Sequence, residues 1–390
     1  PGFKFVSEVK SSGQKTRLLR FTFSTTQTMV VEMGAGYFRF HPDSATLVTD
    51  DGVPYEVANS YLQDDLFSVK YVQSGDILTL VHPNYPPMEL RRYGALDWRF
   101  VSINFSAPIA APTGVTVSRS STDTNYTYTY VVTAVNDNGE ESVASSPVSV
   151  QGNLYNTGAS NTVSWQAVSG AVKYKVYKKS SGVYGYIGVT SGLSLTDDLI
   201  AANTSKVPPE YDVTFTGAGN YPGAVTYFEQ RRCFARTANS PQTLWMTKTG
   251  TESNMSMPIV TADDDAIEIR VATRDANTIL HLVPLSSLVL LTASAEMICT
   301  SNSSSAISQK NIMVKPQAYV GASDVQPAIV NNIMLYVAAR GNHVRELGYS
   351  YNANGFITGD LSLRAPHLFD GKKIVDMAFS ASPYPVAWFI

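Results

Sequence analysis

Residues 61–105 read YLQDDLFSVKYVQSGDILTLVHPNYPPMELRRYGALDWRFVSINF. Gly, Pro and Asp separate four short apolar runs, which lie at 67–72, 77–81, 88–92 and 98–105. Such runs between turn-forming residues are typical of β-strands. Residues 73–76, Gln-Ser-Gly-Asp, suit a tight hairpin. Pro83, Pro86 and Pro87 have no backbone N–H to donate, so we expect strand pairing to stop there. The stretch predicts a four-stranded antiparallel meander.

Copies of this pattern recur along the chain. The first apolar residue of the second predicted strand gives a landmark in each copy: Val30, Ile77, Cys233, Leu288, Ile333 and Val386. Four of the five intervals are 45 to 55 residues, and the fifth becomes 49 when residues 107–213 are set aside. Such a repeat, with four short strands each, predicts an all-β fold, a β-propeller, because blades packed around a centre cover both faces of every sheet. The alternative is an irregular pair of β-sandwiches with accidental spacing.

Residues 107–213 differ from the blades, since Ser, Thr, Tyr and Val dominate their composition. Alternation such as Tyr126, Tyr128 and Tyr130 predicts strands with one buried face. The block resembles a fibronectin type III or related immunoglobulin-like sandwich, with Trp165 and Tyr174 as the expected core anchors. The segment 164–178 looks like that family's first-half strands, and 130–142 looks like its later ones. Their order is reversed here, so either the topology is permuted or the block only resembles the family.

These patterns divide the chain into three parts. We expect residues 1–106 to form the first blades, 107–213 an inserted β-sandwich, and 214–390 the remaining, incomplete blades. The chain stops at Ile390 within an apolar run, so we expect a fragment or missing ends. We also expect unpaired hydrophobic edges at 386–390 and near 3–9.

Composition excludes several classes of protein. The chain has 29 Lys and Arg against 32 Asp and Glu, and this balance disfavours tight binding of nucleic acid through its phosphates. Its most apolar window, 279–291, is interrupted by His281, Pro284 and two serines, which excludes a spanning helix. No signal peptide opens the sequence. Cys233 and Cys299 lie in apolar runs, so buried free thiols are expected.

The sequence contains no specific catalytic signal. The five histidines lack metal-ligand spacing, and no Gly-x-Ser-x-Gly elbow or phosphate-binding loop appears. Gly34-Ala35-Gly36 is more typical of a hairpin turn. Asp263-Asp264-Asp265 suits a calcium site or a catalytic acid, but a solvated turn is the better interpretation. We therefore predict no enzyme, no catalytic, cofactor-binding or metal-binding residue and no cofactor, and we leave binding residues open.

Four long strings carry a family resemblance: residues 23–40, 54–90, 221–250 and 263–297. They resemble the tail hub or nozzle proteins of short-tailed bacteriophages, also described as packaged-DNA stabilisation proteins. The resemblance implies a virion structural protein, assembled in the host cytoplasm with five other copies into a ring. DNA would leave through that ring without sequence-specific binding. Other tail proteins, such as an adaptor and a fibre, spike or needle, are its implied partners. The alternative function is a secreted carbohydrate-binding or glycoside-hydrolase propeller with a fibronectin-like module.

Overall fold

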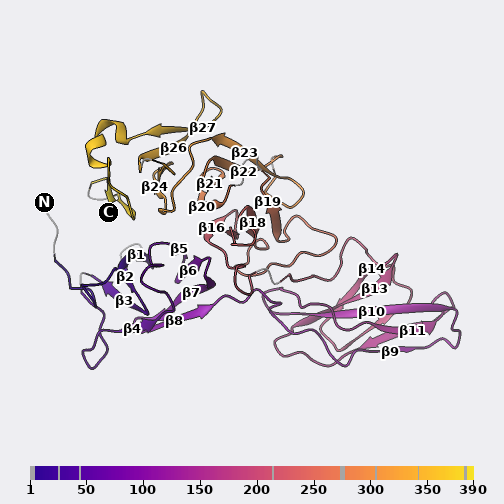
Figure 1. The fold of residues 1–390 in the computed structure, drawn as a ribbon. Helices are drawn as coiled ribbons and strands as arrows, with labels where there is room; N and C mark the ends of the chain where they lie inside the picture. The colour runs from indigo at the N-terminus through magenta and orange to yellow at the C-terminus, as the bar shows by residue number, and fades with distance from the viewer. Residues whose placement is uncertain are drawn as a thin grey trace.

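A computed structural model gives this protein an all-β, propeller-like fold (Figure 1). The structure describes residues 5–24, 27–43, 45–212, 215–272, 277–303, 305–340, 342–381 and 384–390. Five sheets of four antiparallel strands, called blades 1 to 5, and a two-stranded sheet, called blade 6, follow one another within these residues. In Figure 1 the sheets lie around a common centre, and the C-terminal blade returns to the side of the first. The fold class predicted from the repeat is confirmed.

Each of blades 1 to 5 is a meander whose strands pair in chain order. Blade 1 contains β1 (Arg17–Thr22), β2 (Thr28–Gly34), β3 (Tyr37–Pro42) and β4 (Glu56–Ala58). Blade 2 contains β5 (Lys70–Ser74), β6 (Ile77–His82), β7 (Tyr85–Gly94) and β8 (Asp97–Ser102). Blade 3 contains β16 (Ala224–Phe228), β17 (Arg231–Ala235), β18 (Thr243–Met246) and β19 (Ile267–Arg270).

The later blades repeat this plan. Blade 4 contains β20 (Ile279–Pro284), β21 (Leu288–Thr292), β22 (Glu296–Ser301) and β23 (Ile312–Ala318). Blade 5 contains β24 (Ala328–Val330), β25 (Ile333–Val337), β26 (Val344–Ser350) and β27 (Gly355–Asp360). Two 3₁₀ turns, Ser362–Arg364 and Pro366–Leu368, lead to blade 6, formed by β28 (Met377–Ser380) and β29 (Val386–Phe389). All six sequence landmarks lie in the second strand of their blade.

Local turn chemistry explains the strand positions in blade 2. Ser74 pairs with Ile77, and Gly75 between them has a φ of 54°, a conformation that glycine adopts without strain. The expectation that pairing stops at the prolines is wrong, because β7 includes Pro86 and Pro87. The β6–β7 register shifts between Leu80 and His82, so a bulge accommodates the two residues that cannot donate to the ladder.

Apolar clusters between consecutive blades hold the ring together. Blades 1 and 2 share a core that includes Phe21 and Trp98, whose ring centroids are 4.9 Å apart. Similar clusters join blade 2 to 3, 3 to 4, 4 to 5 and 5 to 6. Among the described residues, no apolar cluster joins blade 6 to blade 1. A space of about 640 Å³ lies there instead, lined from blade 1 by residues such as Val30 and from blade 6 by residues such as Phe379.

The block between blades 2 and 3 folds as a two-sheet sandwich. One sheet has the order β11-β10-β13-β14 and the other β15-β12-β9. The strands are β9 (Thr116–Arg119), β10 (Tyr126–Val135), β11 (Val148–Gly152), β12 (Asn161–Ser164), β13 (Lys173–Ser180), β14 (Val183–Thr190) and β15 (Ser194–Asp197). Trp165 and Tyr174 are buried with ring centroids 5.4 Å apart, which confirms them as core anchors. The sheet places the β10–β11 hairpin beside the later β13–β14 hairpin.

The two ends of the sandwich lie close together. Phe105, just before the block, and Phe215, just after it, pack edge to face with centroids 5.0 Å apart. This proximity is what an insertion between two blades requires. The boundaries at 107 and 213 themselves stay predictions, and residue 213 lies outside the described residues.

The edge expected at 386–390 is exposed. Trp388 is 46% exposed and Ile390 77%, whereas the matching strand β21 of blade 4 is buried along its whole length. Phe5 and Val6 near the other end are also exposed, and Phe3 lies outside the described residues. No helix among the described residues has the length and apolar character to cross a membrane.

Candidate functional site

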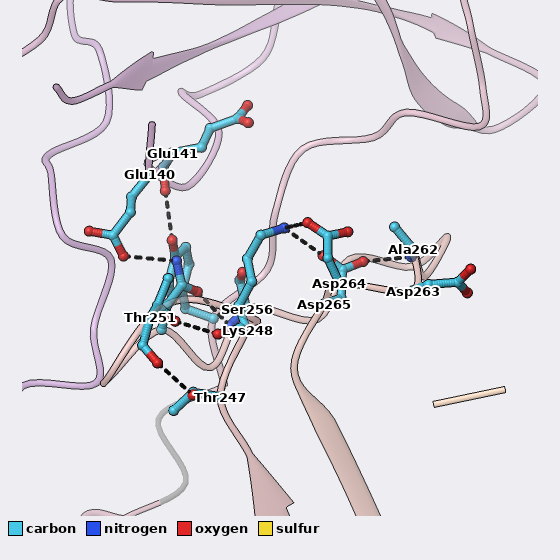
Figure 2. Close-up of polar contacts among 12 residues, drawn as sticks. Glu140, Glu141, Thr247, Lys248, Thr251, Ser256, Ala262, Asp263, Asp264 and Asp265 are labelled. Carbon is cyan, nitrogen blue, oxygen red and sulfur yellow. Dashed lines mark hydrogen bonds and ion pairs between the residues drawn. The ribbon is translucent and has the colours of Figure 1, made fainter. Parts of the chain in front are cut away.

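The aspartate triplet 263–265 forms a turn that the protein's own groups hold in place (Figure 2). The guanidinium of Arg231 donates to the backbone oxygens of Asp265 and Asp263 at 2.6 and 2.8 Å. The carboxylate of Asp265 accepts the backbone N–H of Ala262 at 2.6 Å. The side chain of Asp263 is 83% exposed, with Lys310 3.9 Å away, and that of Asp264 is 58% exposed. The solvated turn expected from the sequence is therefore correct for Asp263 and wrong for Asp265, which is buried.

Lys248 neutralises the two other carboxylates of the triplet. Its Nζ lies 2.9 Å from Asp264 and 3.1 Å from Asp265, as Figure 2 shows. Burial raises the pKa of Asp264, but the hydrogen bond and charge of Lys248 outweigh burial, so this pKa lies below its usual range. Burial lowers the pKa of Lys248, and the two carboxylates more than reverse that effect. Asp264 and Lys248 therefore stabilise each other's ionised forms.

This turn lies beside the junction between the sandwich and blade 3. Asn254 of blade 3 donates to the Glu140 carboxylate at 3.1 Å. The Tyr211 hydroxyl donates to the backbone oxygen of Glu141 at 2.7 Å. Tyr211 also forms a β-bridge with Ser256. In Figure 2 the loop with Glu140 and Glu141 lies directly against the loop with Lys248, Thr251 and Ser256. The sandwich is thus attached through side chains as well as through its two chain connections.

A cleft of about 600 Å³ separates the two parts next to these contacts. Glu141 lies on the sandwich side, where it pairs with Lys175 and accepts the Tyr177 hydroxyl. Burial, followed by the charge of Glu141, raises the pKa of Tyr177 far above its usual range. The lining contains four lysines, at 173, 175, 206 and 248, and four carboxylates, those of Glu140, Glu141, Asp264 and Asp265, so the cleft is polar and nearly neutral. These groups can fix the angle of the sandwich, and they leave no activated nucleophile.

A second polar cluster closes the centre of the ring. Lys70 of blade 2 donates to the backbone oxygen of Asp324 and pairs with its carboxylate at 3.4 Å. Arg236 of blade 3 reaches the same carboxylate at 3.5 Å. Gln326 donates to the backbone oxygen of Tyr71 at 3.0 Å. The loop before β24 thereby binds blades 2 and 3 from the far side of the ring.

The central cluster leaves little open space. The cavity between the first strands of blades 2 to 5 measures about 190 Å³, room for a few water molecules only. Burial lowers the pKa of Lys70 to about 8, and Asp324 opposes that effect only partly. A nucleic-acid duplex cannot pass through this centre.

The structure disperses the titratable residues considered in the sequence. Four histidines contact separate groups: His41 contacts Glu32, His82 the backbone N–H of Asn84, His281 the Ser323 backbone and His343 Asp360. Within the described ranges, no group of three or more His, Cys, Asp or Glu side chains suits a metal ion. Cys233 and Cys299 are buried free thiols, as predicted. Gly34–Gly36 is a hairpin turn, also as predicted, since Gly34 pairs with Tyr37.

Sequence reasoning missed the residues that join distant segments. Glu140 and Asn254 are 114 positions apart, and Lys70 and Asp324 are 254 apart. No local pattern marks either pair, because each residue type is common on strand edges and in loops.

Comparisons with known proteins add little to this geometry. No family model and no curated protein matches the chain. Among solved structures, the chain is similar to YCF48 from Cyanidioschyzon merolae, with 10% identity over 94% of this chain and 91% of that chain and a TM-score of 0.34. It is also similar to the computationally designed Ika8 protein, with 10% identity over 97% and 98% of the two chains and a TM-score of 0.29. Likenesses at this level carry no functional argument, and the fold assignment rests on the sheets.

Proposed function

We propose that this protein is a structural subunit of the tail of a short-tailed bacteriophage, where copies form a ring around the path of the ejected DNA and help to seal the packaged genome. The observation that carries the proposal is the exposed strand β29. β29 forms the edge of the two-stranded blade 6, where the side chains of Val386, Trp388 and Ile390 are exposed. An edge of this kind favours association with another chain.

The closed centre constrains where DNA would run. Because Lys70, Asp324 and Gln326 fill the middle of the sheets, the conduit would lie between subunits and not through the propeller of one subunit. A ring of copies related by a rotation axis leaves such an axial channel. The near balance of basic and acidic residues suits a surface over which DNA slides, since no cationic excess would retain the phosphates.

The proposal does not include catalysis. A glycoside hydrolase needs a carboxylic acid whose pKa is raised and a second carboxylate opposite it. The most conspicuous carboxylates, Asp264 and Asp265, are instead paired with Lys248. The secreted carbohydrate-active alternative therefore predicts turnover of a polysaccharide that is lost when Asp263–Asp265 are replaced by Asn. Our proposal predicts that neither the unchanged protein nor this Asn variant turns over a polysaccharide.

The mass of the native assembly tests the proposed role. Native mass spectrometry of the protein isolated with its tail partners should give six copies in one particle. A species that stays monomeric with those partners present would contradict the proposal.

A further inference from the structure

The end of the sandwich farthest from the blades presents a pair of aromatic rings. Strand β10 runs from Tyr126 to Val135, and its Val135 end leads into the loop that contacts blade 3. Ten residues of extended strand span about 30 Å. Tyr126 therefore lies far from the junction, at the opposite end of β10. Tyr155 lies beside it, with ring centroids 5.3 Å apart and an angle of 58° between the planes.

The two rings are exposed because of how their loop is anchored. Leu154 is buried in the sandwich, and its backbone N–H is bound by the Tyr128 hydroxyl at 3.2 Å. The next side chain, Tyr155, must then point outward, and it is 68% exposed. Tyr126, at the start of its strand, is 48% exposed. The accessible faces of the two tyrosine rings therefore meet at an open angle.

Hydrogen bonds hold the surrounding loops in one arrangement. The carboxylate of Asp123 accepts from the Asn156 amide at 2.9 Å and from the Asn153 amide at 3.4 Å. The two loops are also joined through their serines. The backbone N–H of Ser160 donates to the Ser120 hydroxyl at 2.8 Å, and the backbone N–H of Ser120 donates to the Ser160 backbone oxygen at 2.9 Å. The tyrosines therefore project from a base that is already ordered before a ligand arrives, which reduces the entropy lost on binding.

The composition of the two loops is that of a recognition surface. Residues 119–125 read RSSTDTN and residues 153–160 read NLYNTGAS. Tyr, Ser, Gly and Asn are the residues that binding loops of immunoglobulin-like domains favour, because tyrosine gives rigid contact area and the small polar residues give hydrogen bonds. We propose that this tip, defined as residues 119–126 and 153–160, binds a neutral saccharide.

Charge and size both favour a neutral saccharide. The tip carries one cation, Arg119, and one anion, Asp123, so it offers no net charge to a phosphate or carboxylate polymer. A standard protein interface uses about 20–30 residues on each side, more than this tip provides. The apolar face of a sugar ring matches one tyrosine ring, and its hydroxyls match the amides and hydroxyls of the loops. The inference does not depend on the proposed tail role.

An array of neutral and anionic oligosaccharides, probed with the intact chain, tests the inference. We expect signals among the neutral members, and titration calorimetry with the best of them should show an affinity at least tenfold weaker for Tyr155→Ala. Tyr351→Ala is the matched control, because Tyr351 is a more exposed tyrosine in blade 5. It should bind like the unchanged protein. Asp123→Ala, which loosens the loops while keeping both rings, should weaken binding less than Tyr155→Ala.

Three results would overturn the inference. These are no signal from any neutral member, a preference for anionic members, and equal loss of binding in Tyr155→Ala and Tyr351→Ala. Capture of a protein partner through the tip without any saccharide signal would likewise assign this surface to protein recognition.

Discussion

Two arginine–carboxylate pairs join neighbouring blades, and their surroundings differ. Arg232 of blade 3 and Glu89 of blade 2 lie 2.6 Å apart, with side chains 0% and 2% exposed. Arg17 of blade 1 and Asp376 before blade 6 lie 3.1 Å apart, with side chains 2% and 16% exposed. An apolar cluster lies between blades 2 and 3 beside the first pair, whereas Arg17 and Asp376 of the second pair line a cavity of about 220 Å³. The ring is therefore tightly packed between consecutive blades and polar and open where its ends meet.

The difference indicates where the molecule can accept a partner. Aromatic contacts fill the interface between blades 2 and 3: the ring centroids of Phe105 and Phe234, for example, are 5.5 Å apart. These contacts leave no room for another chain between the two blades. At the ring closure, Leu18 and Val30 of blade 1 and Trp388 of blade 6 stay exposed. We expect perturbations to be most severe at the first interface and mildest at the second.

The largest effect is expected for Glu89→Leu. Arg232 and Arg91 would both lose this carboxylate, and Arg232 is fully buried. Removing one partner of a buried pair destabilises by about 3–5 kcal/mol. Urea unfolding followed by fluorescence should show this loss. In the double variant Glu89→Leu with Arg232→Met, no buried charge is left uncompensated, because Glu252 and Arg91, which lose their partners, are 44% and 39% exposed. Most of the stability should therefore return; a double variant no more stable than the single one would contradict this account.

A pH-dependent effect of intermediate size is expected from Lys70. Its folded pKa of about 8 lies below the usual unfolded value, so the unfolded chain binds more protons between pH 8 and 10. The contribution of Lys70 to stability should therefore rise by about 2 kcal/mol across this window. Burial raises the pKa of both Cys233 and Cys299, and these thiols act in the opposite direction.

The contribution of Lys70 to the pH dependence can be isolated by comparing the unchanged protein with Lys70→Met, because both proteins contain Cys233 and Cys299. The difference in unfolding free energy between the unchanged protein and Lys70→Met should become more favourable to the unchanged protein as pH rises from 8 to 10. Parallel pH profiles would show that Lys70 titrates normally.

A smaller effect is expected for Asp376→Asn at the ring closure. Arg17 keeps its hydrogen bonds to the backbone oxygens of Leu66 and Val69, so its charge stays solvated by the protein. We expect a loss of about 1 kcal/mol. Amide hydrogen exchange should increase in β28 and β29 while blade 4 stays protected. An equal loss of protection from exchange in blades 4 and 6 would mean that the ring closure and the packed blades unfold together.

The smallest effect on stability is expected for Trp388→Ser. The side chain is half exposed, so the change in unfolding free energy should stay within about 0.5 kcal/mol. Assembly should suffer far more, because the substitution removes an exposed aromatic group from β29. Sedimentation of the protein with its tail partners measures this, and Tyr384→Ser, at another exposed aromatic residue near the same edge, serves as control. Unchanged assembly by Trp388→Ser would exclude the edge as an interface.

The sequence predicts the local features of this fold well. Alternating runs and turn residues act over a few positions, so the second strand of every blade could be found from residues such as Ile77 and Leu288. The final strand of blade 1 depends on more than such local signals: β4 is only Glu56–Ala58, because the segment before it folds back on itself through a Val48–Pro54 bridge.

Features that depend on distant contacts could not be predicted. The burial of Asp265 depends on Arg231 and Lys248, and the ring closure depends on Arg17 and Asp376, which are 359 positions apart. The tyrosine pair at the sandwich tip needs β10 and the 153–160 loop to meet. The alternation of Tyr126 with Tyr128 and Tyr130 placed the first ring in a strand but gave no sign of its neighbour Tyr155.

Electron microscopy of the protein in its isolated tail tests the central claim most directly. The account predicts a closed ring of copies in contact through β29 and the open face of blade 1. DNA density should lie on the axis between subunits, and the centre around Lys70 and Asp324 should stay closed. DNA density through the middle of a single propeller, or a monomer bound to glycan in place of a ring, would contradict it.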